Sequence, residues 1–175
     1  MNKNIVITGA NRGIGLAMTK IFKAQGDNVY ALCRKTSNEL EQVATHIITD
    51  IDVATDEGIN NMKRALSGIG IDVLVCNAGI LRDENLTDMN IKTIREQFEI
   101  NALAPIRIVD TLQCNMNFDG KIAMITSRMF STWVCVAASI SSTSMSRPSA
   151  ISRHASHSPH GSAVAPVTQF SARAR

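Results

Sequence analysis

The stretch Thr8-Gly9-Ala10-Asn11-Arg12-Gly13-Ile14-Gly15 places three glycines in a row of eight residues. It follows the apolar run Ile5-Val6-Ile7, which is typical of a buried strand, and precedes Leu16–Phe22, whose apolar spacing is typical of a helix. The glycines therefore lie where a strand ends and a helix begins. Such a turn presents the unpaired N–H groups of the first helical turn to an anion, so it predicts a phosphate site.

Each glycine has a separate physical use in this turn. Gly9 permits the tight turn, Gly13 lets the backbone approach a pyrophosphate with no Cβ in the way, and Gly15 lets the helix pack close to the strand. Glycines also occur in strand-to-helix turns for backbone reasons alone, so a plain turn is the alternative interpretation.

The spacing Thr-Gly-x-x-x-Gly-Ile-Gly, together with four later landmarks, resembles the short-chain dehydrogenase/reductase family. The landmarks are Asp52-Val53, Asn77-Ala78-Gly79, Asn101 and Ile125-Thr126-Ser127. Five landmarks in the right order are specific, and the resemblance covers residues 1 to about 128. It implies a Rossmann-like dinucleotide-binding domain over those residues, in the C-factor-like part of the family.

Two cations, Arg34 and Lys35, follow directly after the expected second strand, Val29–Cys33. In a dinucleotide fold the end of this strand faces the adenosine ribose, where a carboxylate would bind the 2′-hydroxyl and a cation a 2′-phosphate. No acid stands there, and Arg12 in the glycine turn adds a third cation. These charges favour NADP over NAD as cofactor, the alternative being a solvated basic turn.

The resemblance assigns further cofactor contacts at two other strand ends. Asp52 matches an acid that accepts from the adenine amino group, with Val53 beside the ring; Asp50 is the fallback, and either acid could be only a turn or cap residue. Asn77-Ala78-Gly79 is expected to line the cofactor site, and a plain turn is the alternative interpretation. The full set of expected cofactor residues is Thr8, Gly9, Asn11, Arg12, Gly13, Ile14, Gly15, Arg34, Lys35, Asp52, Val53, Asn77, Ala78 and Gly79.

The catalytic residues that the resemblance implies are Ser127, which polarises a substrate oxygen, and Asn101, which holds a water for proton relay. Pro105 deletes a backbone donor and crowds the carbonyl of Asn101, so an asparagine that merely eases a helix kink is an equal alternative. The family also uses a Tyr and a Lys four residues later, after the serine strand. Here the sole tyrosine is Tyr30 and the last lysine is Lys121.

Strands and helices alternate over the first 127 residues, which predicts a doubly wound parallel sheet in the order 3-2-1-4-5. We expect the remaining strands at His46–Val53 with its exit, Ile71–Cys76 and Lys121–Thr126, after a turn at Asp119-Gly120. The first helix should bury Ile14, Ala17, Ile21 and Phe22. The next should begin at a Thr55 cap and bury Ile59, Met62 and Leu66. A kinked helix over 91–112 should bury Ile94, Phe98, Ala102, Ile106 and Val109.

Composition divides the chain near residue 128. Residues 1–127 carry 13 basic and 15 acidic side chains, whereas residues 128–175 carry five arginines and no acid. The later segment is dominated by Ser, Ala, Arg, His and Pro, a composition that cannot bury enough apolar area to offset ordering entropy. We therefore expect residues 129–175 to be a poorly ordered tail, and hypothesise that it is a frame-shifted or truncated product.

The rest of the composition narrows the class of protein. The four cysteines lack metal spacing, and His154, His157 and His160 have no acid or Cys nearby, so we expect reduced thiols and no metal. His46, alone in a strand, is expected to pack. No secretory pattern or membrane-length apolar run is present, which favours a cytoplasmic protein without membrane contact. The arginines of the tail are dispersed and not clustered, so they do not predict a nucleic-acid-binding surface.

Two functions remain open from the sequence. By resemblance the chain is an NADP-dependent oxidoreductase acting on a small-molecule carbonyl or alcohol, impaired because the Tyr-x-x-x-Lys pair is absent. The alternative is a non-catalytic NADP-binding or signalling module, as C-factor-like relatives imply. Because the family dimerises largely through the helix that carries the Tyr, oligomerisation is also doubtful.

Overall fold

The computed structural model describes residues 2–82 and 87–125, which form one five-stranded sheet with helices on both faces. All strand pairs are parallel and the order is β3-β2-β1-β4-β5, which confirms the expected doubly wound sheet. The strands are β1 (Asn4–Thr8), β2 (Asn28–Leu32), β3 (His46–Ile48), β4 (Ile71–Cys76) and β5 (Met116–Met124). Ser127 and the expected tail at 129–175 lie outside the described residues.

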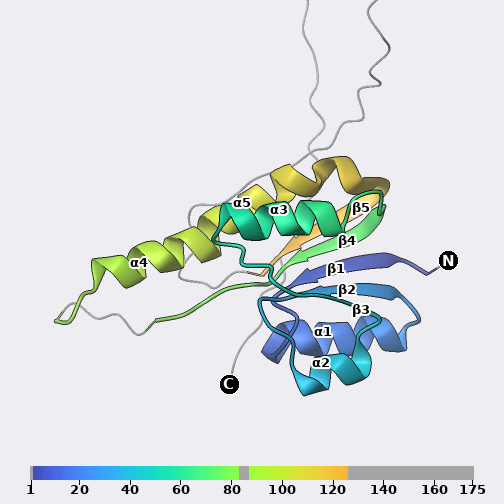
Figure 1. Cartoon of the computed structure of the whole chain (residues 1–175), viewed down its shortest axis with the longest axis horizontal. Coiled ribbons are helices and arrows are strands. Elements are labelled where there is room, and N and C mark those ends of the chain that lie inside the picture. The colour runs from blue at the N-terminus through green and yellow to red at the C-terminus, as the bar shows by residue number, and fades with distance from the viewer. Residues whose placement is uncertain (1, 83–86, 126–175) are drawn as a thin grey trace, which may run out of the picture.

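Helices cover the sheet in two layers (Figure 1). One layer holds α1 (Gly13–Ala24) and α2 (Asn38–Val43), and the other holds α3 (Asp56–Ala65) and α5 (Ala104–Leu112). The helix α4 (Ile91–Phe98) extends beyond the carboxyl ends of the strands and joins α5 through a π-helical turn, η1 (Glu99–Leu103). A 3₁₀ turn, η2 (Gln113–Asn115), leads into β5.

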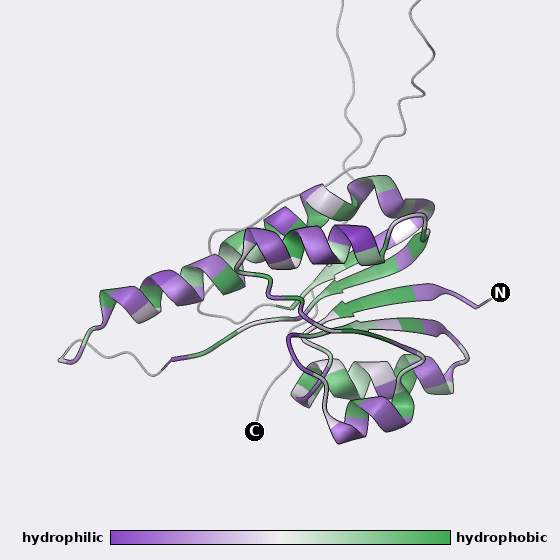
Figure 2. Cartoon of the chain, viewed as in Figure 1, coloured by the Kyte–Doolittle hydropathy of each residue, from purple (hydrophilic) through white to green (hydrophobic). Residues whose placement is uncertain are grey.

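The central strands are apolar on both sides because each face is covered by helices. Figure 2 shows hydrophobic strands in the middle and hydrophilic positions on the outer helix faces. Along β1, Ile5 and Ile7 join the α1 and α2 side of the core, while Val6 joins the α3 and α5 side. All three are fully buried. The alternation of strand side chains thus builds two separate cores from one sheet.

The α3 helix forms as its sequence predicts. The Thr55 hydroxyl accepts the N–H of Gly58 at 3.0 Å and caps the helix, with Asp56 and Glu57 in the first turn. Its inward face is Ile59, Met62 and Leu66, all buried. The α2 helix, which the sequence reading did not identify, begins in the same way: the Ser37 hydroxyl accepts the N–H of Leu40 at 3.3 Å.

The predicted inner face of α1 is wrong at three of four positions. Ile14 and Ile21 are more than half exposed and Ala17 is exposed; only Phe22 is partly buried. The buried positions are Gly15, Leu16 and Thr19. Close contact at Gly15 rotates the helix so that this side meets β1, and the Thr19 hydroxyl, buried there, donates to the Gly15 carbonyl.

The predicted inner face of the helix over 91–112 is wrong at three of its five positions, whereas Val109 packs against the core as predicted. Ile94, Phe98 and Ile106 are exposed, Ala102 and Val109 are half-buried, and the buried side chains are Gln97, Ile100, Ala104, Ile108 and Leu112. Apolar residues lie on both sides of this helix, so spacing alone could not choose between them. The helix is interrupted where expected, because η1 spans Asn101 just before Pro105.

The expected turn at Asp119-Gly120 is not a break between elements. Both residues lie inside β5, which begins earlier than predicted, at Met116. Its register with β4 shifts there: Ile71 pairs with Met116 and Val73 with Lys121. The turn residues therefore form an irregular segment within the strand. The third strand ends at Ile48, and Thr49–Val53 form its exit.

Asp72 joins three strands at the amino end of the sheet. Its carboxylate accepts from Asn117 Nδ2 at 2.7 Å and from the Asn4 N–H at 2.8 Å, and these hydrogen bonds lower the pKa of Asp72 from 3.8. A carboxyl whose folded pKa is depressed contributes stability above the unfolded pKa and loses it as the pH falls through the folded pKa.

Replacing Asp72 with Asn should therefore lower the urea midpoint modestly at neutral pH and have a smaller effect once the pH falls below the depressed pKa of the folded protein, where the wild-type carboxyl is also protonated. Asp119→Asn is the matched control, since Asp119 is exposed on β5 and its carboxylate makes no hydrogen bond within the described residues. An equal loss at both pH values would contradict the assignment.

Candidate functional site

The glycine turn has the backbone that its sequence requires. Gly9 and Gly13 have φ of +66° and +55°, in the left-handed region that favours glycine. The α1 helix follows at once, and its N-cap residue Arg12 makes no side-chain hydrogen bond to the helix. No acid lies in the first turn. The N-terminal donors of a twelve-residue helix thus have no capping side chain, which fits an anion site.

Two of the three glycines are required by the protein's own packing. A methyl group on Gly15 would overlap the carbonyl oxygen of Gly9 and lie 2.6 Å from Asn77 Nδ2, and one on Gly9 would lie 2.9 Å from the Ala78 Cα. By contrast, a methyl on Gly13 would meet nothing within 4 Å. The close helix packing predicted at Gly15 is therefore present. Because the space beside Gly13 is open, the turn also leaves room for a ligand.

The Thr8 side chain joins β1 to the end of β4. It is fully buried, donates to the Val75 carbonyl at 3.4 Å, and accepts the N–H groups of Asn77 and Ala78, both at 3.0 Å. Asn77 Nδ2 returns hydrogen bonds to the carbonyls of Thr8 and Gly9 at 3.0 and 3.2 Å. These bonds fix the Asn77-Ala78 segment against the glycine turn.

The three expected phosphate-binding cations are exposed near this turn. Arg34 and Lys35 follow β2, and Ser37, two residues later, donates to the Asn11 carbonyl at 2.8 Å. That bond brings the segment after β2 against the glycine turn that contains Arg12. Within residues 2–82 and 87–125, none of the three cations forms an ion pair. Sequence reading missed Ser37, although a serine before the acid-rich start of α2 is a helix-cap signal.

The acids after β3 are both engaged in local structure. Asp52 Oδ1 accepts the Ala54 N–H at 3.0 Å, and the Asp52 carbonyl accepts the Thr55 N–H at 3.1 Å. Asp50 has φ of +60° and accepts from the Thr49 hydroxyl. Val53 is buried in the core beneath the loop. The turn role considered for Asp52 is therefore present, and it leaves the second carboxylate oxygen without a hydrogen bond in the described part of the chain.

Asn101 holds the segment after Gly79. Its Oδ1 accepts the Ile80 N–H at 2.9 Å and its Nδ2 donates to the Ile80 carbonyl at 2.7 Å. A methyl on Gly79 would lie 3.2 Å from that Oδ1. The asparagine lies in η1, where the Ala104 N–H bonds the Glu99 carbonyl five residues earlier. Both side-chain groups of Asn101 are therefore occupied by backbone.

Gln97 is a further residue of this wall that sequence reading missed. It is 7% exposed, and its Oε1 accepts the Arg82 N–H at 3.0 Å. Gln97 and Asn101 lie four residues apart on consecutive turns and bind alternate residues of the same extended segment. The available signal in the sequence was a second amide side chain one helical turn before Asn101, because an amide on a buried helix face needs a hydrogen-bond partner.

Comparison with known proteins identifies the family. The model of the short chain dehydrogenase family matches residues 3–140. This chain belongs to the short-chain dehydrogenase family.

Among relatives, a 1-hydroxy-2-glutathionyl-2-methyl-3-butene dehydrogenase of a Rhodococcus species is 25% identical over 127 residues, covering 71% of this chain and 56% of its own. The short-chain dehydrogenase anuB of Penicillium roqueforti is 33% identical, with 67% and 43% covered. A short-chain dehydrogenase/reductase structure from Burkholderia multivorans with bound NADP aligns with a TM-score of 0.66 at 28% identity, covering 73% of this chain and 59% of that one. The chain spans about half the length of these curated relatives.

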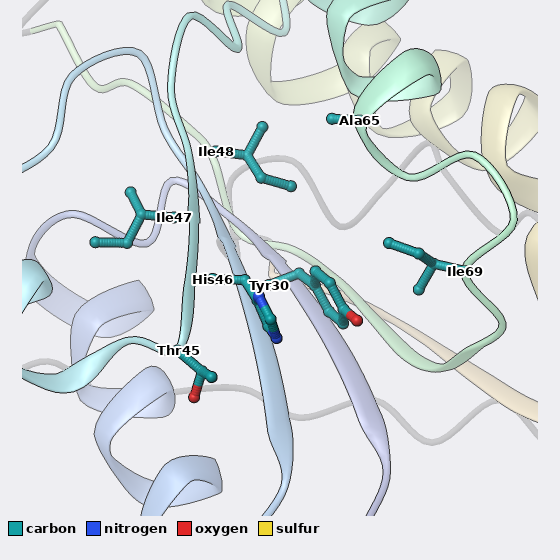
Figure 3. A pocket seen from close by; sticks show the side chains of 7 residues that line it. All are labelled: Tyr30, Thr45, His46, Ile47, Ile48, Ala65 and Ile69. Carbon is teal, nitrogen blue, oxygen red and sulfur yellow. The ribbon is translucent and has the colours of Figure 1, made fainter.

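Other features of this family member lie away from the glycine turn. A hollow of about 540 Å³ lies beside β3, and Figure 3 shows Tyr30 and His46 side by side in its lining. Their rings stack at 4.6 Å, so His46 packs as expected. None of the expected cofactor residues lines this hollow. Among the described residues no cluster of three or more His, Cys, Asp or Glu could hold a metal, and no helix is long and apolar enough to cross a membrane.

The buried cysteines are not poised for chemistry. Burial raises the pKa of Cys76 to about 12 and, with a smaller contribution from the Asp50 charge, raises that of Cys33. Both thiols stay protonated at neutral pH, where a thiol is a poor nucleophile. They act as small apolar groups in the two cores.

Replacing Thr8 with Val keeps the shape of the side chain but removes the acceptor of two backbone N–H groups. We expect a loss of about 1–3 kcal/mol in the free energy of unfolding, measured by urea denaturation. Thr8→Ser keeps the hydroxyl and should lose less than half as much. If the two variants are equally destabilised, the hydrogen bonds are not what joins these strand ends.

Proposed function

We propose that this chain binds NADP at the corner where β1 meets α1, with the diphosphate against the first turn of the helix. The observation that carries the proposal is the uncapped N-terminus of α1 beside the open space at Gly13. Helix N-termini bind phosphate through free N–H groups and the helix dipole. The Burkholderia multivorans relative with bound NADP supports the same choice.

The remaining contacts follow from the positions of the strand ends. Arg12, Arg34 and Lys35 are exposed cations without ion-pair partners in the described residues, and we assign them to the 2′-phosphate. Asp52 and Val53 would hold the adenine end, with Asp52 using its free carboxylate oxygen. Asn77-Ala78-Gly79, fixed by Thr8 and Asn101, would form the wall of the site.

The proposed reaction is reduction of a small-molecule carbonyl or oxidation of an alcohol. When bound, the nicotinamide supplies or accepts hydride. Ser127 would donate a hydrogen bond to the substrate oxygen, and Asn101 would support the relay of a proton to it. The sequence has no Tyr after Tyr30 and no Lys after Lys121, so the positioned general acid of the family is absent. Loss of such a group typically lowers the rate by about 10²–10⁴.

A non-catalytic NADP-binding or signalling module, of the C-factor-like kind, is the second candidate. The missing acid favours it. Assaying NADPH consumption with a panel of aldehydes and ketones separates the two candidates. Binding without consumption would remove the enzyme and keep the module.

NADPH binding should be measurable by titration of its fluorescence, and Gly13→Leu should abolish it. The leucine would fill the open space at the helix start. Gly26→Leu is the matched control, because Gly26 also has a positive φ, +88°, and open space, but lies after the other end of α1. Full affinity in Gly13→Leu, or an equal loss in both variants, would refute the phosphate site.

The choice of NADP predicts the effect of Arg34→Gln. Removing one charge-assisted contact should weaken NADPH binding about tenfold and leave NADH binding unchanged, because NADH lacks the 2′-phosphate. Lys63→Gln removes an exposed cation of α3 and should change neither affinity. Equal weakening of both nucleotides by Arg34→Gln would contradict its assigned role.

A further inference from the structure

We infer that Arg107 is a positioning residue that fixes the Asp52–Thr55 loop for the adenine end of the nucleotide. The inference rests on the nucleotide site proposed above and adds a residue that makes no contact with that site itself. Arg107 lies on α5, far from the glycine turn in the sequence. Its guanidinium hydrogen-bonds to the Asp52–Thr55 loop and to the two elements beside it.

One guanidinium joins three segments of the chain. Arg107 Nη2 donates to Asp56 in the first turn of α3, and Nη1 donates to Glu99 Oε1 at 3.2 Å in η1. The same Nη1 reaches the Ala54 carbonyl at 3.5 Å. The loop after β3 and the turn that contains Asn101 are therefore held by the same side chain.

Burial distinguishes this contact from an ordinary surface ion pair. The Arg107 and Glu99 side chains are 29% and 36% exposed, whereas Lys20 and Glu39 are 49% and 69% exposed; Asp56, at 92%, is the surface partner of Arg107. Exposed pairs contribute little because solvent screens them and two long side chains must be ordered. A guanidinium offers a planar fork of donors to several acceptors, which a lysine ammonium cannot match in geometry. The position therefore needs arginine for its shape as well as for its charge.

The loop that Arg107 contacts is held on its inner side by Val53, which is buried, and by Ala54, which packs against the same core. Ala54, whose carbonyl Arg107 reaches, donates its N–H to Asp52 Oδ1, and the Thr55 N–H bonds the Asp52 carbonyl. Moving Ala54 would thus change the direction of the Asp52 carboxylate. A residue that only clamped α3 to α5 would affect folding stability and leave the affinity of folded protein unchanged.

The test measures nucleotide affinity and loop exchange in Arg107→Met, with Lys20→Met as the matched ion-pair control. Well below the melting temperature, Arg107→Met should raise the NADPH dissociation constant about fivefold, and Arg107→Lys should raise it less. Amide hydrogen exchange of Ala54 and Thr55 should become about tenfold faster in Arg107→Met, with Leu40 as an unaffected reference. Lys20→Met should change neither quantity.

The outcomes separate this inference from the proposed function. If wild-type protein does not bind NADPH, the proposed function fails and the role of Arg107 in nucleotide binding fails with it, whatever the exchange rates. If wild-type protein binds and Arg107→Met shows a lower melting temperature with unchanged affinity or unchanged loop exchange, the positioning role is overturned and the proposed function stands. Asp56→Asn should reproduce the affinity change, and the double variant should add little to it.

Discussion

The structure depends on one hydroxyl, that of Thr8, where the strand order of the sheet reverses. Helices leave β1 and β4 on opposite faces, so their carboxyl ends diverge there and backbone N–H and C=O groups lose ladder partners. The Thr8 hydroxyl and the Asn77 amide satisfy those groups from the side, at distances of 3.0 to 3.4 Å. These hydrogen bonds of Thr8 and Asn77 hold the glycine turn and the Asn77-Ala78 segment in a fixed relative position.

A second layer of contacts places the rest of the carboxyl edge. Gln97 and Asn101 hold the segment that follows Gly79, and Ser37 holds the segment after β2 against Asn11. Arg107 performs the equivalent task for the loop after β3. The proposed binding residues are therefore set by polar side chains that need not contact a ligand. Ser127, assigned to chemistry in the proposed function, lies outside the described residues, so what the structure describes is the proposed nucleotide-binding surface.

The elements that the sequence predicted well have a single strong local signal. Ile71–Cys76 is apolar except at Asp72 and forms a strand with those bounds, and Thr55 is followed by acids and an inward face that the structure buries. The failures have physical causes as well. Apolar residues on two sides of α4 and α5 left the buried face undecided, and the rotation of α1 follows from contact at Gly15. The roles of Gln97 and Arg107 depend on partners at least 15 and eight residues away, which local pattern does not encode.

The π-helical turn Glu99–Leu103 has a consequence for the length of the chain at that point. It holds about one more residue per turn than an α-helix, and the helix that follows it still buries Ala104, Ile108 and Leu112 in the core. Deleting a single residue from the turn would return it to regular α-helix and leave the orientation of α5 about the helix axis nearly unchanged, because the π turn holds the extra residue locally. The packing of α5 therefore tolerates a chain that is shorter by one residue here, whereas loss of Asn101 itself would remove its two hydrogen bonds to Ile80.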